Sequence, residues 1–284
     1  MANEEQGHLP QRSIWSSSEE AEHWQQDVER RRLDFGEATE RMLEAAGLQP
    51  GDHVLDLAAG TGDQSLMAAR LVGPSGSILT TDLSADMLAI AARLAQQEGL
   101  TTLTTRVMDA EQLELEDEAF DAVICRLGLM LLPHPERALR EIHRVLKLGG
   151  KLAALVWSVP EHNPLWSLPL AMLSKYARGA SSPRPNPFAL SDPTVFARDL
   201  TGAGFHAVST RALPFQSRYA SLEAFLHSTG SRLTAGVMGQ LSEQEQQHLL
   251  GEVRQALSQF EGSDGLVAPA ELLLGVGSKE MRPG

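Results

Sequence analysis

The first half of the chain alternates short, continuous apolar runs with longer stretches of helical periodicity. Apolar runs without polar alternation are typical of strands that are buried on both faces of a sheet. Clusters of glycine, proline and aspartate lie between these segments and supply turns. The pattern predicts strands at His53–Leu57, Ser77–Thr81, Thr102–Val107, Phe120–Cys125 and Lys151–Trp157. It predicts helices at Ser18–Gly47, Asp63–Val72, Ser84–Gln97 and Pro135–Leu148, the last of them ended by Gly149-Gly150.

The second half is less regular, and residues 158–192 are rich in proline, serine and tryptophan. Helices are expected at Pro164–Tyr176, Asp192–Leu200, Ser221–Ser228 and Ser242–Phe260, and strands at His206–Pro214 and Leu266–Gly277. Strands that alternate with helices through short connections imply a parallel sheet with helices on both faces. We therefore expect a doubly wound α/β fold.

Charge restricts the partners. The chain of 284 residues has a formal net charge of −13 and an isoelectric point near 5.1. Nucleic-acid binding normally needs a basic face that displaces counterions, so we expect no nucleic-acid partner. The one basic cluster, Arg30–Arg32, has acidic neighbours, and we interpret it as a solvated helix face.

The composition of the chain indicates where the protein is located and which metal sites it can form. No apolar run approaches the ~20 residues that cross a bilayer, so no membrane span is expected. With a single cysteine, Cys125, we expect neither an intrachain disulfide nor a cysteine metal cluster, and we predict no metal site. The start of the chain, M-A-N-E-E-Q-G-H, is acidic and polar, unlike a secretory signal, and we expect a cytoplasmic location.

The segment V-L-D-L-A-A-G-T-G, at residues 54–62, is the most informative about function. An apolar run leads into small residues and two glycines, Gly60 and Gly62, directly before a helical stretch. Such a turn lets the backbone approach a ligand at the helix N-terminus. A dinucleotide turn would read G-x-G-x-x-G, but Ser65 occupies the third glycine position, and Asp56 has no role in a pyrophosphate loop. The turn favours a nucleoside whose charged tail is not a phosphate.

Three further features follow the ends of the next strands. Asp82, about 20 residues after the glycines, can accept hydrogen bonds from both hydroxyls of a ribose, or it can cap the next helix. Asp109 and Ala110 can meet the edge of an adenine, or they can form a turn that ends the third strand. Arg126 follows the fourth strand. Ligands of open α/β sheets bind outside the carboxyl ends of the strands, so these features face one crevice.

Together these residues resemble a class I S-adenosylmethionine-dependent methyltransferase, in the ubiquinone/menaquinone C-methyltransferase-like branch (methyltransferase type 11). The resemblance covers residues 49–157 and rests on V-L-D-L-A-A-G-T-G (54–62), T-D-L-S-A-D-M-L (81–88), D-A-E-Q-L (109–113), F-D-A-V-I-C (120–125) and P-E-R-A-L-R-E-I-H-R-V-L-K-L-G-G (135–150). It implies a Rossmann-like sheet of seven mostly parallel strands with an antiparallel last strand. It also implies S-adenosylmethionine as cofactor, S-adenosylhomocysteine as product, and a small apolar or aromatic metabolite methylated at carbon or oxygen.

The resemblance also implies a set of cofactor-binding residues. These are Asp56, Ala58, Gly60 and Gly62 in the turn around the methionine tail, Asp82 on the ribose, Leu83 and Met87 against the adenine, Asp109 and Ala110 at the adenine edge, and the Arg126 backbone near the methionine. Outside this core the chain departs from the quinone-modifying members, which carry polar residues where this chain reads R-L-G-L-M-L-L-P-H-P.

The acceptor side is less defined. We expect residues 1–48 to form a helical lid, in which Trp15 and Trp24 either cover the cofactor or pack in the core. Residues 49–284 are expected to form the methyltransferase domain, with 158–192 as an insertion in the acceptor pocket. A general base is needed only when the acceptor must lose a tightly held proton. The candidates are His134 and His162, and the competing interpretation of each is a surface or turn residue.

Two other functions stay open. One is a NAD-type dinucleotide oxidoreductase, and the other is a non-catalytic protein that binds S-adenosylmethionine.

Overall fold

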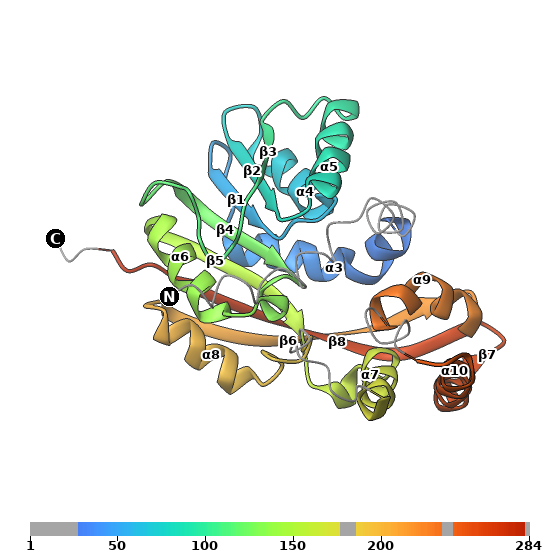
Figure 1. Cartoon of the computed structure of the whole chain (residues 1–284). Helices are drawn as coiled ribbons and strands as arrows, with labels where there is room; N and C mark the ends of the chain where they lie inside the picture. The colour runs from blue at the N-terminus through green and yellow to red at the C-terminus, as the bar shows by residue number, and fades with distance from the viewer. Residues whose placement is uncertain (1–27, 177–185, 235–240, 282–284) are drawn as a thin grey trace. The chain divides into compact units, whose positions relative to one another are not determined.

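The predicted strands form one sheet in the computed structural model, which describes residues 28–176, 186–234 and 241–281 (Figure 1). The strands are β1 His53–Leu57, β2 Ser77–Asp82, β3 Leu103–Val107, β4 Phe120–Arg126, β5 Leu146–Trp157, β6 His206–Tyr219, β7 Glu261–Gly262 and β8 Gly265–Ser278. The helices are α3 Val28–Ala46, α4 Asp63–Val72, α5 Ala85–Gln97, α6 Pro135–Val145, α7 Pro164–Tyr176, α8 Pro193–Gly202, α9 Leu222–Thr234 and α10 Glu243–Leu257. Short 3-10 turns occupy Leu129–Leu131, Pro160–His162 and Ser258–Phe260.

The sheet has the predicted topology. Its strand order is β3-β2-β1-β4-β5-β8-β6, with the short β7 paired to β8 outside this path. The strands β1 to β5 are all parallel to one another, and β8 runs antiparallel to its neighbour β5. The mostly parallel sheet with an antiparallel last strand is thus confirmed, although the sheet has eight strands and not seven among the described residues, and β8 lies between β5 and β6 and not at the edge.

The direction of winding reverses between β1 and β4. β2 and β3 follow on one side of β1, whereas β4 and β5 follow on the other. Because crossovers between parallel strands are right-handed, this reversal places α4 and α5 on one face of the sheet and α6 on the other. A crevice opens at such a switch point, outside the carboxyl ends of the two central strands.

Several predicted boundaries are wrong: β6 continues to Tyr219 and not to Pro214, α9 continues to Thr234 and not to Ser228, α10 ends at Leu257 and not at Phe260, and α6 also ends early. α6 ends at Val145 and not at Leu148, because Leu146 already has extended backbone angles and pairs with Phe120 of β4. The register then shifts within β5, which absorbs Gly149-Gly150 into a strand irregularity with Gly149 at φ +81°. The two glycines therefore mark a bulge and not a helix stop.

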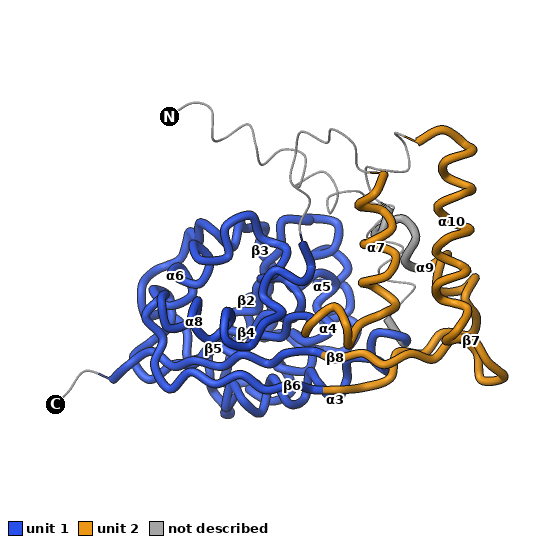
Figure 2. The backbone as a smooth tube through the Cα atoms, turned by 90° about the horizontal axis from the view of Figure 1, so that it is seen from below, with its two compact units in different colours: residues 1–157, 185–213, 272–284 blue, residues 158–184, 214–271 orange. Residues whose placement is uncertain are grey.

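The chain divides into two compact units (Figure 2). Unit 1 comprises Met1–Trp157, Pro185–Leu213 and Leu272–Gly284, and unit 2 comprises Ser158–Arg184 and Pro214–Glu271. The predicted insertion after β5 thus contributes α7 to unit 2, where it shares an apolar core with α9 and α10. Trp15 and Trp24 of the expected lid lie outside the described residues. In the described part of the chain, no helix is long and apolar enough to cross a membrane.

Close packing between β8 and α8 gives a stability test in unit 1. A Cβ atom at Gly275 would lie 2.3 Å from the ring of the buried Phe196. We expect Gly275→Ala to lower the free energy of unfolding by about 1–3 kcal/mol through overpacking. Gly202→Ala is the matched control, since a Cβ atom there meets nothing within 4 Å. Equal urea-unfolding midpoints for the two variants would contradict this account of the interface.

Candidate cofactor site

The turn between β1 and α4 has a backbone that only small residues permit. Ala58, Gly60 and Gly62 all have positive φ, at 51°, 58° and 79°. A Cβ atom at Gly62 would also lie 2.8 Å from the Cβ of Ala91 in α5. The small residues of the motif therefore serve both left-handed backbone angles and close packing on the next helix.

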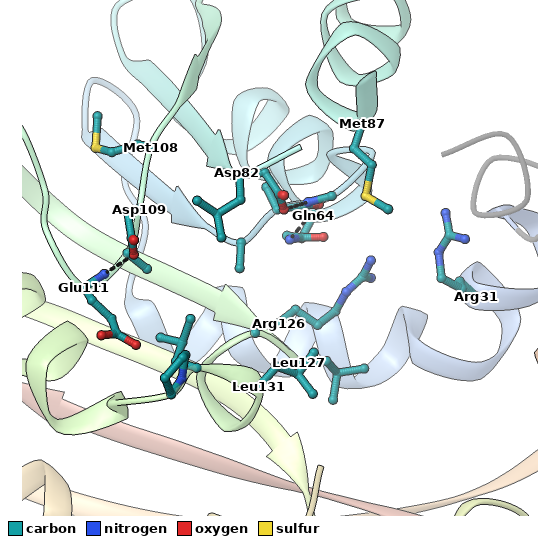
Figure 3. A pocket seen from close by; sticks show the side chains of 18 of the residues that line it. Arg31, Gln64, Asp82, Met87, Met108, Asp109, Glu111, Arg126, Leu127 and Leu131 are labelled. Carbon is teal, nitrogen blue, oxygen red and sulfur yellow. Dashed lines mark hydrogen bonds between the residues drawn. The ribbon is translucent and has the colours of Figure 1, made fainter. Parts of the chain in front are cut away.

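A cavity of about 150 Å³ lies at the switch point, within unit 1 (Figure 3). Eight of the ten predicted cofactor-binding residues line it: Ala58, Gly60, Asp82, Leu83, Met87, Asp109, Ala110 and Arg126. They come from the ends of β1, β2, β3 and β4 and the segments that follow. The structure thus brings most of the predicted set to one cavity.

Asp82 ties the glycine turn to the end of β2. Its carboxylate accepts hydrogen bonds from the backbone N–H of Gly60 at 2.8 Å and of Ser84 at 2.9 Å. Burial raises the pKa of Asp82, although these N–H groups oppose the rise. Ser84, and not Asp82, is the N-cap of α5, because its side chain accepts from the N–H of Met87. Asp82 therefore does not cap α5 but contributes a carboxylate acceptor to the cavity wall, next to the cap residue Ser84.

Asp56 lies behind the cavity wall. It is fully buried, and its carboxylate accepts hydrogen bonds from the Ser65 hydroxyl and from Gln64 Nε2, the latter at 3.1 Å. Burial raises the pKa of Asp56 to about 7, despite the lowering effect of these two donors. Neither Asp56 nor Gly62 is among the lining residues. Asp56 acts on the cavity through Gln64, which does line it.

A charged cluster joins three elements beside the cavity. The Asp63 carboxylate at the start of α4 accepts from Arg31 and from Arg126, each at 3.1 Å. Arg31 also donates to Thr61, and Arg126 to Thr39, again at 3.1 Å in each case. Burial would raise the pKa of Asp63, but the two guanidinium groups outweigh it and lower the pKa.

The interpretation of Arg30–Arg32 as a solvated helix face is wrong for Arg31. Its exposed fraction is 1%, and it lines the cavity. The reason is helical periodicity: Arg31, Phe35 and Met42 share one face of α3, and this helix packs against β4 and β5. The spacing to Phe35 and Met42 in the sequence could have revealed this position.

The two histidine candidates lie outside the cavity lining. The backbone N–H of His134 donates to Glu111 at 2.8 Å, while its ring Nδ1 is 3.6 Å from Glu136. In unit 2, Nδ1 of His162 is 2.7 Å from Glu271 Oε1, which also accepts from the Ser158 hydroxyl at 2.6 Å. Burial alone would raise the pKa of Glu271, but these hydrogen bonds lower it.

Comparison with known proteins identifies the family. The ubiE/COQ5 methyltransferase family matches residues 37–178, half of the chain. The chain belongs to this family. The match includes every predicted cofactor-binding residue, and it begins inside α3 and ends just after α7.

Individual relatives agree with this assignment. The ubiquinone/menaquinone biosynthesis C-methyltransferase of Pseudomonas aeruginosa is 39% identical over 124 residues, covering 43% of this chain and 48% of the relative. Its counterpart from Chromobacterium violaceum is 42% identical over 116 residues, covering 41% and 47%. The chain spans about half the length of the curated relatives it matches.

Solved structures show the same fold. The YcgJ protein of Bacillus subtilis has a TM-score of 0.60 and 19% identity, over 86% of this chain and 99% of its own. An S-adenosylmethionine-dependent methyltransferase of Aquifex aeolicus has a TM-score of 0.52 and 21% identity, over 69% and 92%. The class I methyltransferase fold inferred from the motifs is therefore confirmed.

The cavity also contains residues outside the predicted cofactor-binding set. Beside Arg31, these are Phe35, Ala59, Gln64, Met108, Glu111, Leu127, Gly128, Leu131, Leu132 and Pro133. Most are apolar residues of α3 and of the loop after β4. In sequence such residues are indistinguishable from ordinary core positions, so no local signal marked them.

The raised pKa of Asp56 gives a prediction for stability against pH. A carboxyl whose pKa rises from 3.8 to about 7 on folding binds more protons in the native state between these values, so its contribution to stability falls as pH rises through that window. We expect Asp56→Asn to remove this contribution, on the order of a few kcal/mol. Urea unfolding of both proteins across the window measures it. A wild-type-minus-variant difference that stays constant with pH would contradict the assignment.

Proposed function

We propose that this protein transfers the methyl group of S-adenosylmethionine to a small apolar or aromatic metabolite. The observation that carries the proposal is the set of hydrogen-bond acceptors at the switch-point cavity. Asp82, Asp109 and Gln64 line it, and the two lining arginines both bind Asp63. Acceptors suit the hydroxyls, the amine and the ammonium of an adenosyl amino acid better than they suit a pyrophosphate.

The cavity residues fit this cofactor on an independent ground. Gln64 lines the cavity, and its buried Oε1 has no hydrogen-bond partner among the described residues, a cost that is typical of a functional site. We place Asp82 on the ribose hydroxyls, Asp109 and Ala110 at the adenine edge, and Met87 against the adenine face. When bound, S-adenosylmethionine supplies a methyl group on a positively charged sulfur.

The chemistry needs little more than alignment. The acceptor atom forms a bond to the methyl carbon as the carbon–sulfur bond breaks, the sulfur takes the bonding electron pair, and the acceptor loses a proton to a base or to water. The enzyme holds acceptor and methyl in line, about 3 Å apart, and excludes water. Phe35, Leu127 and Leu131 form an apolar side of the cavity that suits an apolar or aromatic acceptor.

Relatives of this chain are named for C-methylation in ubiquinone and menaquinone biosynthesis. The segment after β4, R-L-G-L-M-L-L-P-H-P, is more apolar than the polar segment expected of quinone-modifying members. We therefore leave the acceptor at the level of an apolar or aromatic metabolite. In this proposal nucleic acid is not a partner.

His162 is our proposed base, should the acceptor need one. Glu271 can hold the ring with Nδ1–H toward the carboxylate, which leaves Nε2 as the acceptor of a proton. Nδ1 of His134 lies 3.6 Å from the half-exposed Glu136, whereas Nδ1 of His162 lies 2.7 Å from Glu271, whose side chain is only 15% exposed. The carboxylate geometry favours His162 over His134.

Cofactor binding is tested by calorimetry with Asp82→Asn. The change removes the charge that accepts from the ribose hydroxyls, and hydrogen bonds to charged groups are worth about 1.5–3 kcal/mol. We expect the Kd for S-adenosylmethionine to rise about 10–100-fold. Glu114→Gln, at an exposed carboxylate of unit 1, is the control and should leave the Kd unchanged. Absence of saturable binding to the wild-type protein, or preference for NAD in the same assay, would refute the proposed cofactor.

Activity is tested by transfer of labelled methyl from S-adenosylmethionine into the small molecules of a cell extract. A labelled metabolite identifies the acceptor, and His162→Gln should then lower its kcat by about 100-fold or more while the Kd for the cofactor stays unchanged. His134→Gln is the matched comparison and should keep wild-type kcat. Tight cofactor binding with no labelled product would favour a non-catalytic binding protein.

A further inference from the structure

The loop between β4 and α6 contains two kinds of apolar residue. Leu129 and Met130 are buried and anchor the short 3-10 turn in the core. Leu131, Leu132 and Pro133 follow directly, and these three line the cavity without being buried. Consecutive apolar side chains that the core leaves uncovered beside a cavity are typical of a surface that contacts a ligand. We call these three residues the apolar wall.

Glu111 connects the apolar wall to the cofactor side of the cavity. Its carboxylate Oε1 accepts a hydrogen bond at 2.8 Å from the backbone N–H of His134, the residue that directly follows the wall. Its own backbone N–H donates to Asp109 Oδ1 at 2.9 Å. Glu111 itself lines the cavity, and in Figure 3 its side chain extends away from Asp109. One residue is therefore bonded through its backbone to the proposed adenine contact and through its side chain to the end of the wall.

The start of α6 explains why a side-chain acceptor is needed here. His134 is the N-cap residue of α6, and its side chain forms no capping hydrogen bond. In a capping box, a glutamate or glutamine three residues later accepts from the N-cap backbone N–H, but that position is Arg137 in this chain. Glu111, from the connection between β3 and β4, takes this role instead. The position of the wall therefore depends on a residue of the cofactor side.

We propose that Glu111 is a positioning residue for the methyl acceptor, because it holds the apolar wall in place relative to the adenine contact Asp109. The inference rests on the proposed function, since it assumes that an apolar or aromatic acceptor contacts this wall. Methyl transfer requires the acceptor atom and the methyl carbon to be aligned about 3 Å apart, so a small displacement of the wall slows the reaction. The role requires an oxygen at Oε1 that accepts from His134, and it does not require a negative charge. This requirement distinguishes it from the role of a general base.

The test uses Glu111→Met, which keeps the side-chain length, removes both oxygens and leaves the backbone bond to Asp109 intact. Transfer of labelled methyl from saturating S-adenosylmethionine is measured with a limiting amount of the cell extract, so that the rate reports kcat/KM for the acceptor. We expect this rate to fall about tenfold or more. The Kd for S-adenosylhomocysteine, measured by calorimetry, should change less than about threefold. Glu111→Gln retains an oxygen that accepts from the His134 N–H and should restore the rate to within about threefold of wild type.

Glu116→Met is the matched control, because Glu116 is exposed in the same connection between β3 and β4, and this variant should keep the wild-type rate. A wild-type rate in Glu111→Met would overturn the inference. A loss of S-adenosylhomocysteine binding as large as the loss of rate would also overturn it and make Glu111 part of the cofactor site. Failure of Glu111→Gln to restore the rate would overturn it in favour of a role for the negative charge. If the wild-type protein bound no S-adenosylhomocysteine or labelled no metabolite, the proposed function itself would be refuted.

Discussion

The Asp63 carboxylate, held between two guanidinium groups, determines how the site is assembled. It begins α4 directly after the glycine turn, while Arg31 comes from α3 and Arg126 from the end of β4. Side-chain exposure is 2% for Arg31 and 8% for Arg126, so these charges are largely removed from water. Burying ions is costly, and removing one partner of such a cluster typically costs about 3–5 kcal/mol. The cluster therefore fixes three elements in a single arrangement around the cavity.

The same region carries other costs that a purely structural loop would avoid. Ala58 and Leu127 have left-handed backbone angles without being glycine, at the ends of the two adjacent central strands. A Cβ atom at Gly128 would lie 2.5 Å from the Cβ of Ala58, so the two turns are in close contact. Backbone strain, a buried acid with a raised pKa and an unpartnered carbonyl all occur in this one place. Such costs persist where function requires them, and the rest of the fold compensates.

The central strands β1, β4 and β5 could be predicted from the sequence because they are mostly buried and contain continuous apolar runs, whereas β3 and β6 are largely exposed. His53–Leu57 and Pro164–Tyr176 match β1 and α7 residue for residue. The end of α6 could not be predicted, because a Gly-Gly pair marks a helix stop and a strand bulge equally well. Arg31 was misassigned because a charge in a basic run is normally solvated, and only its partners Asp63 and Thr61, distant in sequence, make burial acceptable.

The cofactor end and the acceptor end of the site differ in predictability for a physical reason. In the proposed binding mode the cofactor groups meet carboxylates and small residues near strand ends, where the sequence spacing dictates position. Asp82 closes β2, and Asp109 lies two residues after the end of β3. The apolar side comes from α3 and the loop after β4, where Phe35 and Leu131 serve as core and as ligand contact alike. Hydrophobic contacts lack direction, so these residues select the shape of an acceptor and do not specify its chemical groups. A chain can therefore specify its methyl donor through a few polar atoms while its acceptor depends on packing that no short motif records.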